Sequence, residues 1–249
     1  MITVDPGKLN LQLGQRVLDL GCGEGRHAIH LLISEPLEVV GIDLSQSDIE
    51  TAQDRAEAFR QQGSVPGRLL LGVADGLQLP FADGAFDVVI CSEVLEHVED
   101  CTGLLGEIDR VLKPAGIFAA SVPAFFPEWI CWQLREEYHQ VEGGHIRIFR
   151  ESELRNAIEQ QGHRYFAGHR AHALHAPYWW LKCLLWKRPA SRLLNAYHRL
   201  LVWDLMQKPL LTRWLEKLLN PILGKSIVLY FVKPAKAETG LPTAAGAVS

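Results

Sequence analysis

The amino-acid sequence predicts an α/β fold with a mostly parallel sheet and helices on both faces, and two observations predict it. Short runs rich in β-branched residues alternate with helical patterns through the first two-thirds of the 249-residue chain, an order typical of strand–helix–strand units. The run 16–20 (RVLDL) also leads through three closely spaced glycines into a helical pattern at 26–34. A strand that turns so tightly into a helix is typical of parallel sheets with a ligand site at their carboxyl edge.

The remaining elements follow from local patterns. Strands are expected at 37–43, 69–74, 86–91, 117–122 and 163–168. Helices are expected at 101–112, at 151–161, and between the strands at 37–43 and 69–74, where the helix runs to about residue 62. Either Ser45 or Ser47 is expected to cap the helix that runs to about residue 62. Lys113-Pro114 ends the next helix, because proline disfavours the helical conformation in the residue before it. The apolar run 226–232 (SIVLYFV) is expected to close the edge of the sheet beside the strand at 163–168.

The chain is expected to form a single domain at 1–234, with a helical cap inserted at about 171–225 and a disordered tail at 235–249. The cap is rich in Leu, Trp and basic side chains. Such a block can pack around its own aromatic core, line an apolar tunnel for an isoprenoid or acyl chain, stack on a sugar, or lie on an anionic membrane surface. In the last case a peripheral membrane contact would run through 172–215.

Composition and charge argue against several classes of protein. Apolar residues make up 48% and charged residues 22% of the chain, which is typical of a globular protein. The net charge of −4 argues against nucleic acid as a partner. Five cysteines without a C-x-x-C spacing favour reduced thiols, and the first residues lack a signal-peptide pattern. We therefore expect a cytoplasmic protein, with peripheral contact to the inner face of the membrane as an addition.

The glycine loop is the most informative motif. Three glycines let the backbone turn tightly and approach a ligand, and the helix behind them offers free N–H groups. They are Gly21, Gly23 and Gly25. Asp43 ends the next strand, where a carboxylate can accept from ribose hydroxyls, and Asp75-Gly76 follows the third strand at the same edge. A nicotinamide dinucleotide would use the same crevice, but its fingerprint needs a glycine where this chain has Arg26.

Four stretches of the sequence together resemble a known family. They are VLDLGCGEG, VVGIDLS, ADGLQLPFADGAFDVVICSEVLEHV and LKPAGIFAASVP. In order and spacing they resemble the class I S-adenosylmethionine-dependent methyltransferases, of the small-molecule type similar to ubiquinone and menaquinone biosynthesis methyltransferases. The resemblance covers about 10–165. It implies a Rossmann-like seven-stranded sheet with an antiparallel last strand, which suits the run at 226–232, and it implies S-adenosyl-L-methionine as the cofactor.

The resemblance also implies a role for each matching position. The glycine loop and the acid before it would hold the methionine moiety, and the acid after the second strand would bind the ribose hydroxyls. Residues after the second and third strands would surround the adenine, and those after the fourth would face the methionyl end and the substrate. The implied cofactor residues are Asp19, Gly21, Cys22, Gly23, Gly25, Asp43, Leu44, Asp75, Gly76, Leu77, Ser92 and Glu93.

Methyl transfer is an in-line displacement at a carbon that the sulfonium already activates, so the enzyme mainly aligns the reactants and excludes water. An oxygen or nitrogen acceptor can also need a base. The catalytic candidates are His145 and His139, which lie in a Gly-containing loop before a helix, and Glu93, which would face the substrate. The alternative is that His145 only braces the loop, and His97 is expected to structure a turn. No metal is expected, although Glu142, His139 and His145 are residue types that suit zinc.

The predicted function is methyl transfer from S-adenosylmethionine to a small-molecule acceptor. The cap favours O-methylation of a lipid-linked, quinone-like or sugar (glycolipid) acceptor. A non-catalytic subunit that binds the cofactor is an alternative, and a NAD-dependent oxidoreductase is a weaker one, which Arg26 opposes.

Overall fold

The computed structural model describes residues 2–63, 65–141, 143–207 and 209–235. The tail predicted to be disordered lies, from residue 236 onward, outside these described residues.

A seven-stranded sheet forms the centre of the structure, in the order β3-β2-β1-β4-β5-β7-β6. The strands are β1 (Arg16–Leu20), β2 (Glu38–Asp43), β3 (Arg68–Val73), β4 (Phe86–Ser92), β5 (Leu112–Pro123), β6 (Arg164–Ala171) and β7 (Ser226–Val232). β7 runs antiparallel to both β5 and β6, and the other described pairs are parallel. The predicted fold class is confirmed. Because the chain winds outward in opposite directions from β1 and β4, a crevice opens between their carboxyl ends, where ligands of such sheets bind.

The position of β7 corrects one prediction. The strand was expected at the sheet edge, but it pairs with both β5 and β6, and β6 forms that edge. The burial pattern gives the physical reason. Every residue of β7 except Val232 is buried, whereas β6 alternates between more and less exposed positions. A strand that is apolar on both faces is most stable between two neighbours, with both faces covered.

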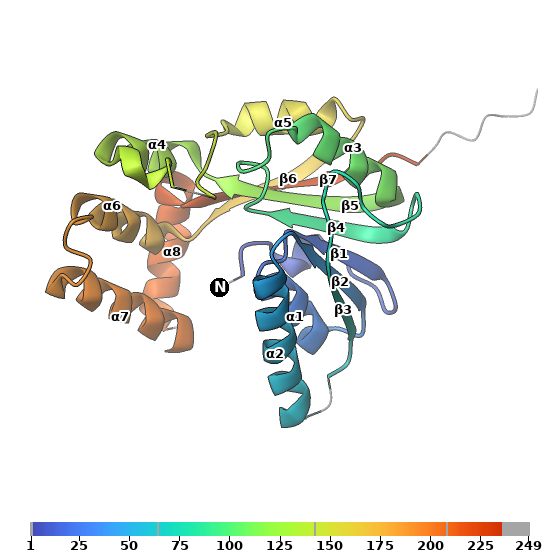
Figure 1. Cartoon of the computed structure of the whole chain (residues 1–249), viewed down its shortest axis with the longest axis horizontal. Coiled ribbons are helices and arrows are strands. Elements are labelled where there is room, and N and C mark those ends of the chain that lie inside the picture. Colours follow the sequence, from blue (N-terminus) through green and yellow to red (C-terminus); the bar gives the residue numbers. More distant parts are fainter. Residues whose placement is uncertain (1, 64, 142, 208, 236–249) are drawn as a thin grey trace, which may run out of the picture.

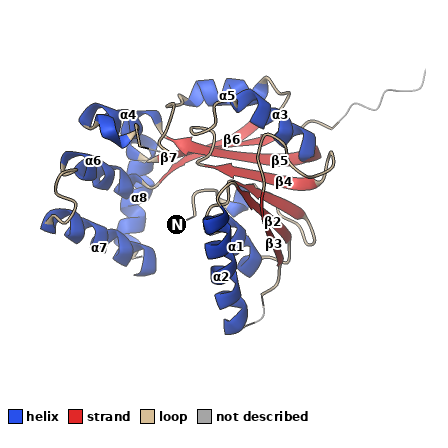
Figure 2. Cartoon of the chain, viewed as in Figure 1, coloured by secondary structure: helices blue, strands red, loops and turns tan. Residues whose placement is uncertain are grey.

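Helices cover both faces of the sheet (Figures 1 and 2). They are α1 (Arg26–Ser34), α2 (Gln46–Gln62), α3 (Cys101–Val111), α4 (Phe125–Leu134), α5 (Glu151–Glu159), α6 (Ala176–Leu184), α7 (Arg192–Gln207) and α8 (Leu210–Leu223). Leu104 of α3 and Leu154 of α5 pack in the core of one face, and Ala28 and Leu31 of α1 pack in the core of the other. Ser45 rather than Ser47 caps α2, since its hydroxyl accepts from the Asp48 N–H at 3.3 Å.

Two further elements differ from the sequence prediction. The helix α4, which contains Pro127, was not predicted. Pro127 lies in the first turn, where a helix does not need that N–H, so the residue is compatible with the helix. The strand β5 begins at Leu112, directly after α3, rather than at residue 117.

The cap helices α6, α7 and α8 lie between β6 and β7 in the sequence and gather on one side of the molecule (Figure 1). The indole N–H of Trp180 in α6 donates to the Pro127 carbonyl of α4 at 3.0 Å, so α6 packs on α4. By contrast, Trp203 and Trp214 remain 47% and 70% exposed. Within the described ranges, no helix combines the length and the apolar character needed to cross a bilayer.

Candidate functional site

The glycine loop follows β1 at the point where the winding direction of the sheet changes. Gly21, Gly23 and Gly25 all have positive φ, at 69°, 50° and 82°. The N–H groups of Gly21 and Cys22 both donate to the Ile42 carbonyl, at 2.8 and 3.0 Å, which fixes the loop against β2. A Cβ at Gly21 would collide with the Val94 side chain, whereas one at Gly23 would meet open space. Gly21 is therefore required both for its backbone conformation and for its lack of a side chain.

Asp43, at the end of β2, holds the loop from the other side. Its Oδ2 accepts from the Gly23 N–H at 2.7 Å, and its Oδ1 accepts from the Ser45 N–H at 2.9 Å. Each carboxylate oxygen has a second lone pair that these backbone contacts leave available. The carboxylate thus lies where the sequence predicted it, against the loop and at the rim of the crevice.

Asp19 lies beneath the loop and is fully buried. Its Oδ2 accepts from the Ala28 N–H in the first turn of α1 at 2.9 Å. Its Oδ1 is buried and has no hydrogen-bond partner among the described residues. Burial raises the pKa of Asp19 to about 7, and the Ala28 N–H only partly opposes this.

The raised pKa of Asp19 makes a prediction for stability. The unfolded chain releases this proton near pH 4 and the folded chain near pH 7, so stability falls as the pH rises through that window. The expected slope from this group is about 1.4 kcal/mol per pH unit. Asp19→Asn keeps an oxygen for the Ala28 N–H but cannot ionise, and its stability should lack this slope. Urea unfolding of both proteins between pH 4 and 8 measures the difference, and parallel curves would contradict the prediction.

Two cavities open on either side of the loop. One of about 680 Å³ is lined by eight of the predicted cofactor residues, which are Gly21, Gly23, Asp43, Leu44, Asp75, Gly76, Leu77 and Glu93. The other, of about 820 Å³, adds Cys22, Gly25 and Ser92. The structure thus brings all the predicted cofactor residues together except Asp19, which supports the loop from below.

Three further side chains of the first cavity, those of Leu44, Leu77 and Asp75, suit a planar ring. Leu44 is 71% exposed and Leu77 is 41% exposed, although both are apolar. The Asp75 Oδ1 accepts from the Leu77 N–H at 2.9 Å, which orients this exposed carboxylate at the cavity. Two exposed apolar side chains and one carboxylate acceptor in the same cavity are groups that suit the faces and amino edge of a ring such as adenine.

The Cys22 and Arg26 side chains both make contacts within the protein. The Cys22 side chain is buried beside Gly41, so the loop presents its backbone rather than its thiol, and burial raises the pKa of that thiol above its ordinary value. The Arg26 guanidinium lies 3.5 Å from the Ser92 Oγ. Arg26 therefore links the start of α1 to the end of β4, at the position where a dinucleotide fingerprint needs glycine.

Glu93 follows β4 with a positive φ of 59°, which is uncommon outside glycine. Its N–H donates to the Ser121 carbonyl at 2.8 Å, and the Ser121 hydroxyl donates to its Oε1 at 3.1 Å. Ser92 shares a hydrogen bond of 2.8 Å with the same Ser121 hydroxyl. These contacts hold Glu93 at the junction of the two cavities, where it lines both.

His145 forms a pair with Glu128, a residue that sequence reasoning missed. The His145 Nδ1 lies 2.6 Å from the Glu128 Oε1. Glu128 is buried and also accepts from the Trp132 indole N–H at 3.1 Å and the Tyr138 hydroxyl at 3.2 Å. Burial raises the pKa of Glu128, but the His145 hydrogen bond and nearby Lys225 lower it, and the net shift is downward. The only sequence signal was one acid within an otherwise apolar stretch, FFPEWICW.

His97, rather than His145, lines the first cavity. The His97 and His145 rings pack edge to face with centroids 4.9 Å apart, so His145 contacts a residue of the cavity wall. The His97 Nδ1 lies 3.2 Å from the Gly144 carbonyl. Burial, followed by the neighbouring His145, lowers the pKa of His97. His97 thus connects the His145–Glu128 pair to the cavity.

His139 lies apart from this arrangement. Its ring stacks on Trp132 at 4.0 Å with an interplanar angle of 10°, and it lines neither cavity. Glu142, considered with it as a zinc ligand, lies outside the described residues.

Glu96 is a second residue that sequence reasoning missed. It is 1% exposed, and neither carboxylate oxygen has a hydrogen-bond partner among the described residues. Burial, reinforced by the nearby Glu93 charge, raises the pKa of Glu96 well above its ordinary value. Ligand-type atoms of Glu96, His97 and His145 lie within 4.8 Å of one another.

Comparison with known proteins identifies the type of domain. Residues 18–120 match the family model described as a methyltransferase domain. The 27-O-demethylrifamycin SV methyltransferase of Amycolatopsis mediterranei is 38% identical over 113 residues, 45% of this chain and 40% of that protein. A sterol 24-C-methyltransferase of Aspergillus fumigatus is 30% identical over 151 residues, 61% of this chain and 37% of that protein. The chain therefore matches less than half the length of these curated relatives.

Solved structures share the fold over most of the chain. A methyltransferase-type structure from Bacillus halodurans has a TM-score of 0.60 at 20% identity and covers 92% of this chain and 96% of its own. The [4+2]-cyclase SpnF has a TM-score of 0.60 at 21% identity, with 90% and 77% covered. These similarities show the fold alone, since the same fold carries different chemistry.

Proposed function

We propose that this chain, whose residues 18–120 match the methyltransferase domain model, is a class I S-adenosylmethionine-dependent methyltransferase that transfers a methyl group to a small-molecule acceptor. The proposed reaction is O-methylation of a lipid-linked, quinone-like or sugar (glycolipid) acceptor. The single observation that carries the transfer activity is the cavity of about 680 Å³, where the glycine loop, Asp43 and Asp75 meet Glu93.

The residues present fit S-adenosylmethionine. Asp43 and Asp75 would hold its ribose and adenine, and Leu44 and Leu77 would cover the ring. When bound, the cofactor supplies an activated methyl group. The open space above Gly23 supports a close approach of the ligand to the loop backbone.

The His145–Glu128 pair supports a base near the acceptor. When the Glu128 carboxylate accepts from Nδ1–H, Nε2 is the imidazole nitrogen that can take up a proton. Trp132 and Tyr138 fix the carboxylate, so the ring orientation is set before the acceptor binds. His97 lines the cavity next to this pair and is the second candidate for the proton acceptor. Glu93 is proposed to align the acceptor, because it lies at the junction of both cavities.

The test is turnover in the presence of defined acceptors. The purified chain is incubated with S-adenosylmethionine and with quinols, lipid-linked hydroxyl compounds or sugars. We expect S-adenosylhomocysteine to form with at least one class, together with a product heavier by one methylene. A chain that binds the cofactor and turns over none of them would favour the non-catalytic subunit. Binding of NAD with no binding of S-adenosylmethionine would favour the oxidoreductase.

We also propose a cytoplasmic location with peripheral membrane contact through 172–215. The exposed Trp203 and the basic side chains of the cap support this contact.

A further inference from the structure

The helix α8 carries an apolar face that the described part of the chain does not cover. Six apolar side chains of this helix are between 38% and 74% exposed, namely Leu210, Leu211, Trp214, Leu215, Leu218 and Ile222. Successive residues of an α-helix are about 100° apart around its axis, so these six side chains fall within one arc of about 140°. Thr212 points the other way and is buried against the rest of the protein.

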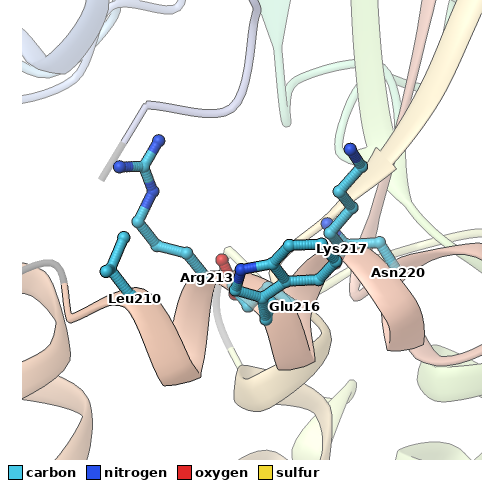
Figure 3. A pocket seen from close by; sticks show the side chains of 6 residues that line it. Leu210, Arg213, Glu216, Lys217 and Asn220 are labelled. Atoms are coloured by element: carbon cyan, nitrogen blue, oxygen red, sulfur yellow. The ribbon is translucent and has the colours of Figure 1, made fainter.

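Two cations border this apolar face. Arg213 and Lys217 fall side by side next to the apolar arc, on the same helical spacing. Figure 3 shows the Arg213 and Lys217 side chains extending from α8, with Leu210 at the end of the group nearer to Arg213. These residues line a surface pocket of about 490 Å³, and the Lys217 ammonium lies 6.0 Å from the Trp214 ring centroid. The acid in this pocket, Glu216, is half-buried, and burial raises its pKa.

The charge of the chain is divided unevenly. Residues 171–225 contain nine Lys and Arg and two Asp and Glu, a net charge of +7. The chain as a whole carries −4, so the remaining residues carry −11. A cationic surface on an acidic protein directs binding to one side of the molecule. An anionic partner would be attracted to the cap and repelled by the rest.

We infer that the apolar face of α8, with its border of Arg213 and Lys217, docks on the surface of an anionic lipid bilayer. Trp214 and the leucines would enter the interface, while the two cations would meet lipid phosphates. A helix with one apolar face, a basic border and an aromatic residue between them has the pattern of interfacial helices. This inference extends the proposed membrane contact beyond residue 215 and does not depend on methyl transfer.

The experiment is vesicle flotation of the purified full chain. Vesicles of phosphatidylcholine with about 30 mol% phosphatidylglycerol, in the range of anionic membranes, are compared with vesicles of phosphatidylcholine alone. We expect binding to the anionic vesicles that weakens as salt is added. The double variant Arg213→Gln/Lys217→Gln should bind about 25-fold more weakly, because each cation near an anionic surface contributes about five-fold. Trp214→Ser should also weaken binding, since it removes the aromatic residue from the apolar face.

A matched control separates this face from general charge effects. Arg60→Gln/Arg68→Gln removes two exposed cations from α2 and β3 and should leave binding unchanged. Equal loss in both double variants, or no flotation with anionic vesicles at low salt, would overturn the inference. A dimer in light scattering that Trp214→Ser dissolves would also overturn it, because a second copy would then cover the face. Titration with S-adenosylmethionine runs beside each variant, so loss of cofactor binding is recognised as a separate failure.

Discussion

Asp43→Ala is expected to weaken S-adenosylmethionine binding about 100-fold or more, because two hydrogen bonds from ribose hydroxyls to a carboxylate contribute about 3 kcal/mol together. The same change frees the Gly23 N–H, which Asp43 holds at 2.7 Å, so the loop loses its support as well. Isothermal titration of the wild type and the variant with S-adenosylmethionine and S-adenosylhomocysteine measures the effect.

Asp48→Ala is the matched control for Asp43. Asp48 lines the same cavity and carries the same charge, but its carboxylate holds no glycine-loop N–H in the described structure. We expect this variant to bind the cofactor within a few-fold of the wild type. Thermal unfolding of both variants checks that they fold. Full cofactor binding by a folded Asp43→Ala protein would mean that the cofactor does not occupy the cavity beside the glycine loop.

His145→Gln is expected to lower kcat by about 10²- to 10⁴-fold with an acceptor identified by the turnover screen, the range typical of losing a general base. Glutamine keeps an N–H donor for Glu128 but cannot take up a proton, so the buried carboxylate need not lose its partner. Binding of S-adenosylmethionine should be unchanged, because His145 lines neither cavity at the glycine loop. Single-turnover kinetics separates the chemical step from binding.

Glu128→Gln tests whether Glu128 acts through His145. The variant keeps an oxygen for the His145 Nδ1–H but removes the negative charge that stabilises a protonated imidazole. We expect a smaller loss of kcat than in His145→Gln. His97→Ala is the comparison. If His97→Ala abolishes turnover and His145→Gln does not, the base is His97.

The glycine loop and the order of the elements were predictable from sequence because their signals are local. The strand at 16–20, the turn through Gly21, Gly23 and Gly25, and the helix at 26–34 occur where the sequence predicted them. Positive φ at closely spaced positions needs glycine whatever the rest of the chain does. Asp43 was predictable for the same reason, since the carboxyl ends of neighbouring parallel strands meet at one edge of the sheet.

The pairing of β7 and the partner of His145 were decided only by the tertiary structure. A periodic pattern states which face of an element is apolar but not which neighbours it meets, so SIVLYFV predicted a strand without its place between β5 and β6. Glu128 and His145 are 17 residues apart in the sequence and on different elements, and no local pattern joins them. The exposed face of α8 is likewise visible only after the core has formed. Local backbone geometry and side-chain chemistry thus determined the glycine loop, whereas contacts between distant segments determined the His145–Glu128 pair and the exposed apolar face of α8.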